Sequence, residues 1–149
     1  SGPMAHQDRR PADAEWQGNL QQGKGKMSVG SGAFEGNFSF KSRFGDETTG
    51  TNPEELLGAA HAGCYSMALS NALATAGFTP TSVHTTARVQ LNQVPGGVAI
   101  GPIDLETQGV VPGIDEETFQ KLAEDAKQNC PVSKALASVP INLKATLSK

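Results

Sequence analysis

The chain has 149 residues and a formal net charge of −3, and hydrophobic residues make up 37% of it. Counting the glycines brings the apolar share to about 48%, which is ordinary for globular proteins and excludes a wholly disordered chain. A mildly acidic chain without a cluster of Lys and Arg is not expected to bind nucleic acid or an anionic membrane, and no apolar run is long enough to cross a bilayer.

The beginning of the chain differs in character from the rest. Ser1, Gly2 and Pro3 precede Met4 and are typical of a protease-cleavage remnant, and a short polar arm follows. We expect residues 1–11 to be this remnant with a flexible arm, and residues 12–149 to form one domain, as the chain length allows. Two cysteines are too few for a secreted disulfide framework, so the cytoplasm is the expected location.

The first part of the domain is predicted to consist of short strands separated by glycine-rich turns. The clearest strand is Asn37–Phe44, in which three phenylalanines would share one face. A polar loop over residues 45–50 follows. Asn52 as a cap, Pro53 at the first helical position and an acid at Glu55 then predict the start of a helix.

This helix is predicted to run to Ala76 and to end at Gly77. Apolar or small residues occupy nearly every face of it, so the helix needs cover on all sides. A single small sheet covers one side only. We therefore expect a homodimer in which the central helices of two chains pack together between two sheets.

The second part of the domain is predicted to alternate between strands and helices. Apolar residues at helical spacing follow Asp115, and the helix must end near Asn129 because Pro131 restricts the residue before it. The predicted elements are strands at 83–91 and 103–111 joined by a turn at 95–97, helices at 115–129 and 133–137, and a strand at 141–147. Strands in groups around few helices indicate an α+β fold.

Cys64 and Cys130 are the strongest candidates for chemistry. Cys64 lies in the middle of the long helix, where a buried cysteine commonly acts as a small hydrophobic residue. Cys130 lies at the break before a short helix, where unpaired amides lower the pKa of a thiol, although a cysteine in a turn need have no function. The two could also form a permanent structural disulfide, but in the cytoplasm a reversible bridge is expected instead.

The dipole of its own helix cannot activate Cys64. This residue lies roughly 18 Å along the axis from the helix start, and the influence of the dipole fades within the first turn. An unperturbed thiol is only about 3% ionised at pH 7, so a reactive Cys64 needs a cation, for which Arg43 and His61 are the candidates. A Cys64–His61 couple would be typical of a thiol hydrolase or acyl transferase, but both residues share one helix and no third, orienting residue is evident.

Two segments around these cysteines resemble the OsmC/Ohr family of thiol peroxidases. The segments are Thr51–Cys64 and Asn129–Ser133, and Phe40–Phe44 and Gly77–Ser82 also fit. The resemblance covers most of the chain, over residues 13–147. It is closer to the osmotically inducible (OsmC) branch than to the organic hydroperoxide resistance branch.

The resemblance implies an intertwined α+β homodimer, with two β-sheets around two buried central helices and active sites at the subunit interface. It implies that Cys64 is the peroxidatic cysteine and Cys130 the resolving one. It further implies that Arg43 binds the Cys64 thiolate and that Glu54 holds this arginine. The implied substrates are organic hydroperoxides in preference to hydrogen peroxide, and the implied reductant is an external dithiol such as a lipoylated protein. No metal, haem, flavin or other cofactor is implied.

The candidate site residues can be compared with what each of three functions requires. In a peroxidase, the peroxide oxidises Cys64 to a sulfenic acid, and Cys130 condenses with it to a disulfide. A non-catalytic, stress-related or small-molecule-binding dimer of the same fold would not need all four site residues, and their presence argues against it. A thiol hydrolase would turn over without peroxide and without Cys130.

Overall fold

The computed structural model describes residues 9–148, so the predicted cleavage remnant, residues 1–3, and most of the predicted arm up to residue 11 lie outside the described residues. The chain forms two compact units, one up to Pro53 and the other from Glu54 onward. The expected single domain over 12–149 stays a prediction. Within the described part of the chain, no helix is both long and apolar enough to span a membrane.

The N-terminal unit is built on a three-stranded antiparallel sheet. Its strands, in spatial order, are β1 (Ala12–Gln17), β2 (Lys24–Val29) and β3 (Glu35–Phe38). Trp16 of β1 and Phe38 of β3 meet across β2, with ring centroids 5.3 Å apart. Gly25 of β2 lies between the two rings, where a Cβ would come within 2.6 Å of each. The contact between the rings therefore depends on a glycine at this position.

The predicted strand Asn37–Phe44 is wrong beyond Phe38, because the chain turns there into a short helix, α1 (Phe40–Phe44). The Ser42 N–H donates to the Ser39 hydroxyl at 3.1 Å, and the Ser39 N–H donates to the Ser42 hydroxyl at 2.8 Å. Two phenylalanines four residues apart then pack on one face of the helix, with ring centroids 4.9 Å apart. The phenylalanine spacing fits either structure, and the capping box selects the helix.

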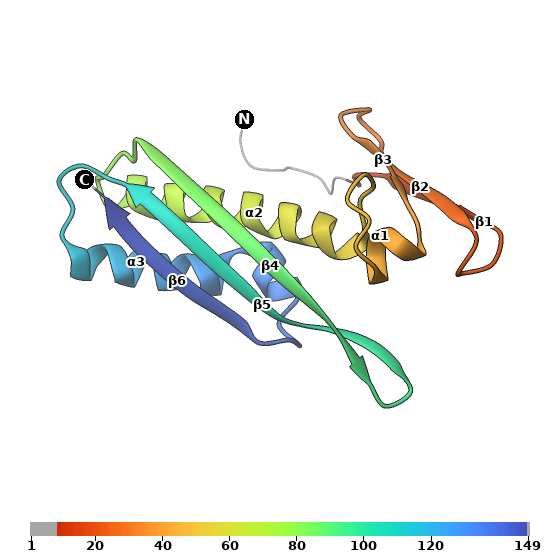
Figure 1. The fold of residues 1–149 in the computed structure, drawn as a ribbon. Coiled ribbons are helices and arrows are strands. Elements are labelled where there is room, and N and C mark those ends of the chain that lie inside the picture. The colour runs from red at the N-terminus through yellow and green to blue at the C-terminus, as the bar shows by residue number, and fades with distance from the viewer. Residues whose placement is uncertain (1–8, 149) are drawn as a thin grey trace. The chain divides into compact units, whose positions relative to one another are not determined.

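The C-terminal unit contains the second sheet, in the order β4–β5–β6. Its strands are β4 (Ser82–Val94), β5 (Gly97–Val110) and β6 (Ile141–Ser148). The first two form the predicted antiparallel hairpin, whereas β6 runs parallel to β5. A parallel neighbour requires a crossover connection, which the helices α3 (Glu116–Asn129) and α4 (Pro131–Ala135) supply (Figure 1).

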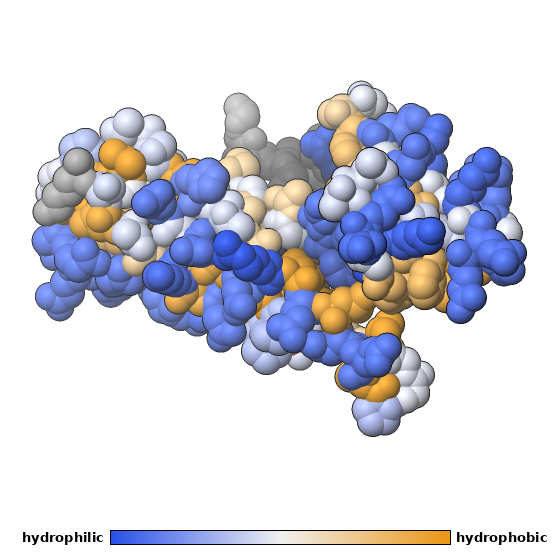
Figure 2. Space-filling model, in the orientation of Figure 1, coloured by the Kyte–Doolittle hydropathy of each residue, from blue (hydrophilic) through white to orange (hydrophobic). Residues whose placement is uncertain are grey.

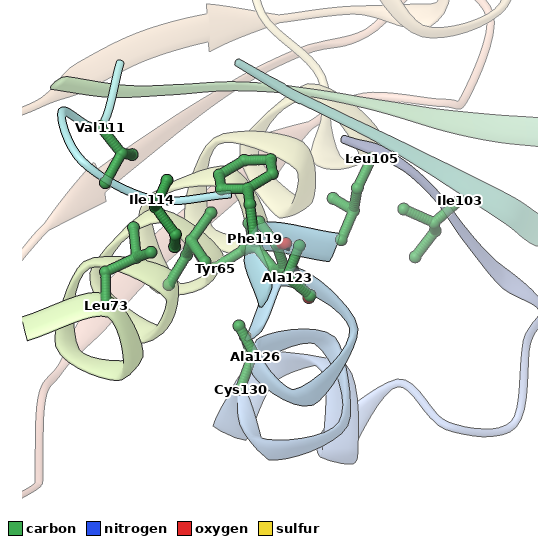
Figure 3. Packing of buried hydrophobic residues seen from close by; sticks show 11 residues of the cluster. Tyr65, Leu73, Ile103, Leu105, Val111, Ile114, Phe119, Ala123, Ala126 and Cys130 are labelled. Carbon is green, nitrogen blue, oxygen red and sulfur yellow. Dashed lines mark hydrogen bonds between the residues drawn. The ribbon is translucent and has the colours of Figure 1, made fainter. Parts of the chain in front are cut away.

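The helices α3 and α2 (Pro53–Thr75) cover one face of this sheet, and the core of the unit lies between them and β5 (Figure 1). Figure 3 shows Phe119 of α3 close to Tyr65 of α2 and to Ile114 in the loop before α3. The Tyr65 hydroxyl donates to the Ala123 carbonyl at 2.9 Å and so joins the two helices directly. This packing fixes the middle of α2 against the C-terminal half of the chain.

The helix boundaries confirm most of the predicted ones. Gly77 follows α2 with a φ of +96°, and the Phe78 N–H donates to the Leu73 carbonyl at 2.8 Å, a C-terminal motif for which glycine is best suited. Asp115 caps α3, and the helix ends at Asn129 as predicted. The short helix α4 begins two residues earlier than predicted, at the proline that follows the break.

The outer face of the second sheet is polar. Alternate residues of β4 and β5 point away from the helices, and on this face Arg88 pairs with Glu106 at 3.0 Å. Figure 2 shows hydrophilic residues over this sheet, beside smaller hydrophobic areas. The sheet is therefore a two-layer element with one face packed on helices and one in contact with water.

Only one face of α2 is buried within the chain. Its buried residues recur every three or four positions, at Glu54, Gly58, His61, Tyr65, Leu69 and Leu73. The opposite face carries small residues and a methionine, Met67, that is 76% exposed. The small residues and Met67 on this face agree with the prediction that α2 has apolar or small residues on nearly every face. Among the described residues, other parts of the chain pack against only one of these faces.

Candidate active site

The two cysteines lie together in the C-terminal unit. Cys64 is in the middle of α2, Cys130 is between α3 and α4, and their Sγ atoms are 3.1 Å apart. Both are free thiols, of which Cys130 is fully buried and Cys64 partly exposed. A reagent from outside can therefore reach Cys64, whereas Cys130 can react only through its neighbour.

The break between two helices positions Cys130. Its backbone is extended, its N–H donates to the Ala126 carbonyl at 2.9 Å, and its carbonyl accepts from the Lys134 N–H at 3.0 Å. It is thus the last cap of α3 and the first cap of α4, with Pro131 opening the second helix. The predicted placement of Cys130 at a helix start is confirmed.

Hydrogen-bond donors gather around one sulfur more than around the other. Burial by itself raises the pKa of Cys130, but the hydrogen bond with the Cys64 thiol and the polar groups of Ser133 and Val132 outweigh it and lower this pKa. Burial raises the pKa of Cys64, the bond to Cys130 raises it further, and only the Val132 backbone opposes them. Within this unit, the pKa of Cys64 is thus raised and that of Cys130 is lowered.

His61 lies one turn before Cys64 on α2 but bonds elsewhere. Its Nε2 is 2.7 Å from the Ser133 hydroxyl of α4, and the side chain is fully buried. Burial lowers the pKa of this imidazole and so favours the neutral ring. Among the described residues, Nδ1 has no hydrogen-bond partner. A neutral ring that bonds to Ser133 supplies no cation to Cys64, so the couple that a thiol hydrolase would use is not formed.

Arg43 lies on α1 in the N-terminal unit rather than at the end of a strand as predicted. Its guanidinium carbon is 5.2 Å from the centre of the Phe44 ring. Among the described residues, Arg43 is the one charged side chain lining a pocket of about 410 Å³, whose other lining residues are Trp16, Gly18, Leu20, Phe38, Ser39, Phe40 and Phe44. Aromatic walls with a single cation suit a ligand with an apolar body and an electron-rich end.

Glu54 lies in the first turn of α2, where a carboxylate complements the helix dipole, and it is 6% exposed. It precedes Cys64 on the same helix by about 15 Å along the axis. Within the units, the structure therefore brings together Cys64 and Cys130. Arg43 belongs to the N-terminal unit, and Glu54 stands at the start of α2.

Sequence reasoning missed the residues that surround Cys130. The polar groups of Val132 and Ser133 lower the pKa of Cys130, and the Ser133 hydroxyl lies 2.7 Å from Nε2 of His61. The local signal was present, because a serine at the third position of a helix can turn its hydroxyl back toward the residue before the helix. The sequence contains no signal for the bond between Ser133 and His61, because the two residues are 72 positions apart.

The described residues offer no metal site. No group of three or more His, Cys, Asp or Glu side chains that could hold a metal ion occurs within residues 9–148. The site is therefore described by its two thiols and the donors around them.

Comparison with known proteins gives a consistent set of relatives. A family model described as OsmC-like protein matches residues 45–144. The chain is 50% identical over 128 residues to Peroxiredoxin OsmC of Escherichia coli (strain K12). The alignment covers 85% of this chain and 89% of that protein. It is 37% identical over 87 residues to an organic hydroperoxide resistance protein of Xanthomonas axonopodis pv. citri (strain 306), in an alignment that covers 58% of this chain and 59% of the other.

A solved structure extends the likeness to the fold. The crystal structure of an organic hydroperoxide resistance protein from Elizabethkingia anophelis matches with a TM-score of 0.72 at 28% identity. The match covers 98% of this chain and 99% of that one. Nearly the whole of this chain therefore has a counterpart in a known structure.

Proposed function

The chain belongs to the OsmC-like protein family, and from this premise we propose that Cys64 reduces an organic hydroperoxide to an alcohol and that Cys130 then closes a disulfide with it. The protein is a thiol-dependent peroxidase of stress defence, as the resemblance in its sequence implied. The observation that carries the proposed roles is the distance of 3.1 Å between a partly exposed and a fully buried free thiol.

The proposed reaction has two steps on the protein and one with an external reductant. The Cys64 thiolate attacks the distal peroxide oxygen, the O–O bond breaks, and the alkoxide leaves and takes up a proton to become an alcohol. Cys130 then attacks the Cys64 sulfenic acid, which gives a disulfide and water. An external dithiol reduces the disulfide by exchange and becomes a disulfide itself. Hydrogen peroxide is a poorer substrate in the same reaction.

Arg43 is the cation that we assign to Cys64. The surroundings of Cys64 support this assignment, because burial raises the pKa of this thiol within the C-terminal unit, so the thiolate needs a cation. Full ionisation of a thiol gains only some 30-fold at pH 7, so Arg43 must also stabilise the departing alkoxide. A guanidinium can bind sulfur and peroxide oxygens together, because its donors form a rigid fork.

The pocket beside Arg43 supports an organic peroxide as the substrate. Its aromatic lining offers an apolar tail a place away from water, and the guanidinium offers the peroxide group a donor. The proposed orientation places the tail against rings such as Trp16 and Phe40 and the O–O group at Arg43. A small peroxide without a tail gains nothing from the apolar lining.

A homodimer is proposed because one face of α2 is without cover in the described residues. This face consists of small residues around Gly63 and of the exposed Met67, and close helix packing favours such residues. Antiparallel packing of two such helices would bring the partner's helix start toward Cys64. Glu54 of one chain could then hold an arginine that serves the thiol of the other.

A reducing compartment and a dithiol partner complete the proposal. Two free cysteines that must return to the thiol state after each turnover suit the cytoplasm. Because the disulfide joins a buried sulfur to a partly exposed one, the reductant must attack at Cys64. A flexible dithiol arm, such as that of a lipoylated protein, suits this access.

The test is peroxide consumption by the reduced protein with reduced lipoamide as the electron donor. We expect turnover with cumene hydroperoxide and tert-butyl hydroperoxide, and slower turnover with hydrogen peroxide. Cys64→Ser is the inactive control. Consumption that persists in the Cys64→Ser protein, or thiol-dependent ester hydrolysis without peroxide, would contradict the proposed function.

A further inference from the structure

One side of the pocket beside Arg43 is formed by a leucine that the fold leaves largely in water. Leu20, in the turn between β1 and β2, lines this pocket and is 58% exposed. Among the described residues, Met67 is the one large apolar side chain that is more exposed. Phe44, which is 38% exposed, lines the same pocket. An apolar group bound in the pocket would remove part of both surfaces from water.

The turn that carries Leu20 is fixed by hydrogen bonds to the residue before it, Asn19. The Gln22 N–H donates to the Asn19 side-chain oxygen at 2.7 Å, and the Gly23 N–H donates to the Asn19 carbonyl at 2.9 Å. The indole N–H of Trp16 donates to the same carbonyl at 3.1 Å. Because this indole is itself a wall of the pocket, its bond ties the turn to the pocket. Leu20 is therefore placed before any ligand arrives, which lowers the entropy that binding costs.

The other apolar walls of the pocket come from two different elements. The sheet contributes one pair of rings and α1 contributes another, which are Trp16 with Phe38 and Phe40 with Phe44. Leu20 belongs to neither element and adds the side that the turn supplies. A peroxide held at Arg43 by its oxygens can cover Leu20 only with a tail, and hydrogen peroxide has none.

We propose that Leu20 is a specificity-determining residue, which contacts the hydrocarbon tail of the substrate and makes the protein favour hydroperoxides with an aromatic or otherwise bulky tail. This inference rests on the proposed function, because it takes the pocket beside Arg43 as the place of the tail. Leu20 has no polar side-chain atom, so it acts on the binding of the tail and leaves the cleavage of the O–O bond to other residues.

The size of the effect follows from the apolar surface that the tail covers. Each methylene group removed from water is worth about fourfold in an equilibrium constant. Leu20→Ala removes the branched end of the side chain, part of which is already covered in the free protein. We therefore expect a loss of about 5- to 20-fold for a substrate with a bulky tail, within the range for lost methylene groups in hydrophobic pockets.

The test compares the rate constants with which the reduced protein consumes one equivalent of different peroxides. Leu20→Ala should lower the rate constant for cumene hydroperoxide by about 5- to 20-fold and that for tert-butyl hydroperoxide by less. The rate constant for hydrogen peroxide should stay within about twofold of the wild-type value, because this substrate makes no tail contact.

Three further variants show whether the apolar surface of Leu20 is the cause. Leu20→Met keeps an apolar side chain of similar volume and should retain the preference for cumene hydroperoxide. Leu20→Asn keeps a similar size but is polar, and should resemble Leu20→Ala. Gln21→Ala changes the exposed neighbour in the same turn, which does not line the pocket, and should behave as the wild type.

A second readout needs no turnover, because Trp16 is the only tryptophan of the chain and lines the pocket. In a Cys64→Ser background, titration with cumyl alcohol, the product from cumene hydroperoxide, should change the Trp16 fluorescence to saturation. Leu20→Ala in the same background should raise the Kd of cumyl alcohol by about 5- to 20-fold. Unchanged circular dichroism checks that the variants are folded.

An unchanged rate constant for cumene hydroperoxide in Leu20→Ala would overturn the inference, as would an equal loss for cumene hydroperoxide and hydrogen peroxide. A fluorescence titration without saturation, or a Kd for cumyl alcohol that Leu20→Ala leaves unchanged, would overturn it as well. Failure of the proposed function is visible elsewhere, as a wild-type protein that consumes none of the three peroxides.

Discussion

The interior of α2 around Cys64 and the break between α3 and α4 around Cys130 are two different settings for the same side chain. At the break, the hydrogen bond with Cys64 and the polar groups of Ser133 and Val132 lower the pKa of Cys130. Inside α2, nearly all backbone donors are used by the helix itself, and burial raises the pKa of Cys64. The thiol inside α2 is thus partly exposed with a raised pKa, whereas the thiol at the break is buried with a lowered pKa.

This difference explains why the site needs residues from more than one place. A peroxide can reach Cys64, whose pKa is raised, but not the buried Cys130, whose pKa is lowered. In the proposed function, Arg43 supplies the charge at Cys64, and Cys130 can act as the resolving thiol while buried because its proposed target lies 3.1 Å away. Each prediction below alters one side of this comparison.

Removal of either thiol should give the largest and the most unequal effects. Cys64→Ser should abolish peroxide consumption, because no other thiol meets the substrate. Cys130→Ser should consume one equivalent of peroxide per chain and then stop as a sulfenic acid. Mass spectrometry of the protein after one addition of peroxide distinguishes these outcomes. Equal residual turnover in the two variants would contradict the assignment of different roles to Cys64 and Cys130.

Replacement of Arg43 should have the next largest effect. Arg43→Ala should slow oxidation of Cys64 by roughly 100-fold or more, as loss of a transition-state donor does. Arg43→Lys should be nearly as slow, because a point charge lacks the two-pronged geometry. Lys41→Ala, on the same short helix, is the matched control and should keep the wild-type rate. An Arg43→Lys protein that retained most of the wild-type rate would contradict the proposed role of the planar guanidinium.

Glu54 should act across the dimer interface, because it lies about 15 Å along α2 from the thiol of its own chain. The test mixes a Cys64→Ser protein with a Glu54→Ala protein under conditions that exchange subunits. Each heterodimer then holds one site with both defects and one with neither, so about a quarter of all sites should regain activity. Glu55→Ala in place of Glu54→Ala is the control for an acid at the helix start.

The outcome that counts against a composite site is the absence of recovery in a mixture whose heterodimers are seen by mass spectrometry. In that case Glu54 acts within its own chain. The proposed antiparallel packing of the two α2 helices would then be wrong.

The buried imidazole predicts a smaller effect, on stability. Burial lowers the pKa of His61 in the folded protein, whereas an unfolded histidine has a pKa of about 6.5. Below pH 6.5 the unfolded chain binds a proton at this histidine that the folded chain does not bind. The free energy of unfolding therefore falls by up to about 1.4 kcal/mol per pH unit, until the pH reaches the pKa of His61 in the folded protein. His61→Gln should flatten this decline in denaturant unfolding measured from pH 7 downward, and His84→Gln, on the exposed face of β4, should not.

Features set by neighbouring residues in the chain were predictable from the sequence. The start of α2 at Pro53 and its end before Gly77 follow from capping signals, and Pro131 places the break at Cys130. The short helix α1 was mistaken for a strand, because the phenylalanine spacing suits both structures and only the Ser39–Ser42 capping box distinguishes them.

Contacts between distant parts of the chain were not predictable from spacing. The approach of Cys64 to Cys130 came from the resemblance to a family, and no local pattern contains it. The bond between His61 and Ser133 depends on how α2 packs against α4, and a histidine within an apolar helix does not indicate its partner. Both contacts join residues that lie far apart in the chain, which is why the surroundings of the two cysteines were less predictable than the helices that bear them.

Carbon NMR of the two cysteine Cβ atoms, followed against pH, tests most directly whether the fold charges Cys130 and Arg43 charges Cys64. The Cβ shift of each residue reports its own ionisation whether or not the sulfur is exposed. We predict that Cys64 ionises first in the wild-type protein and that Cys130 ionises first in Arg43→Ala. Cys64 ionising first in both proteins would contradict this division of charge.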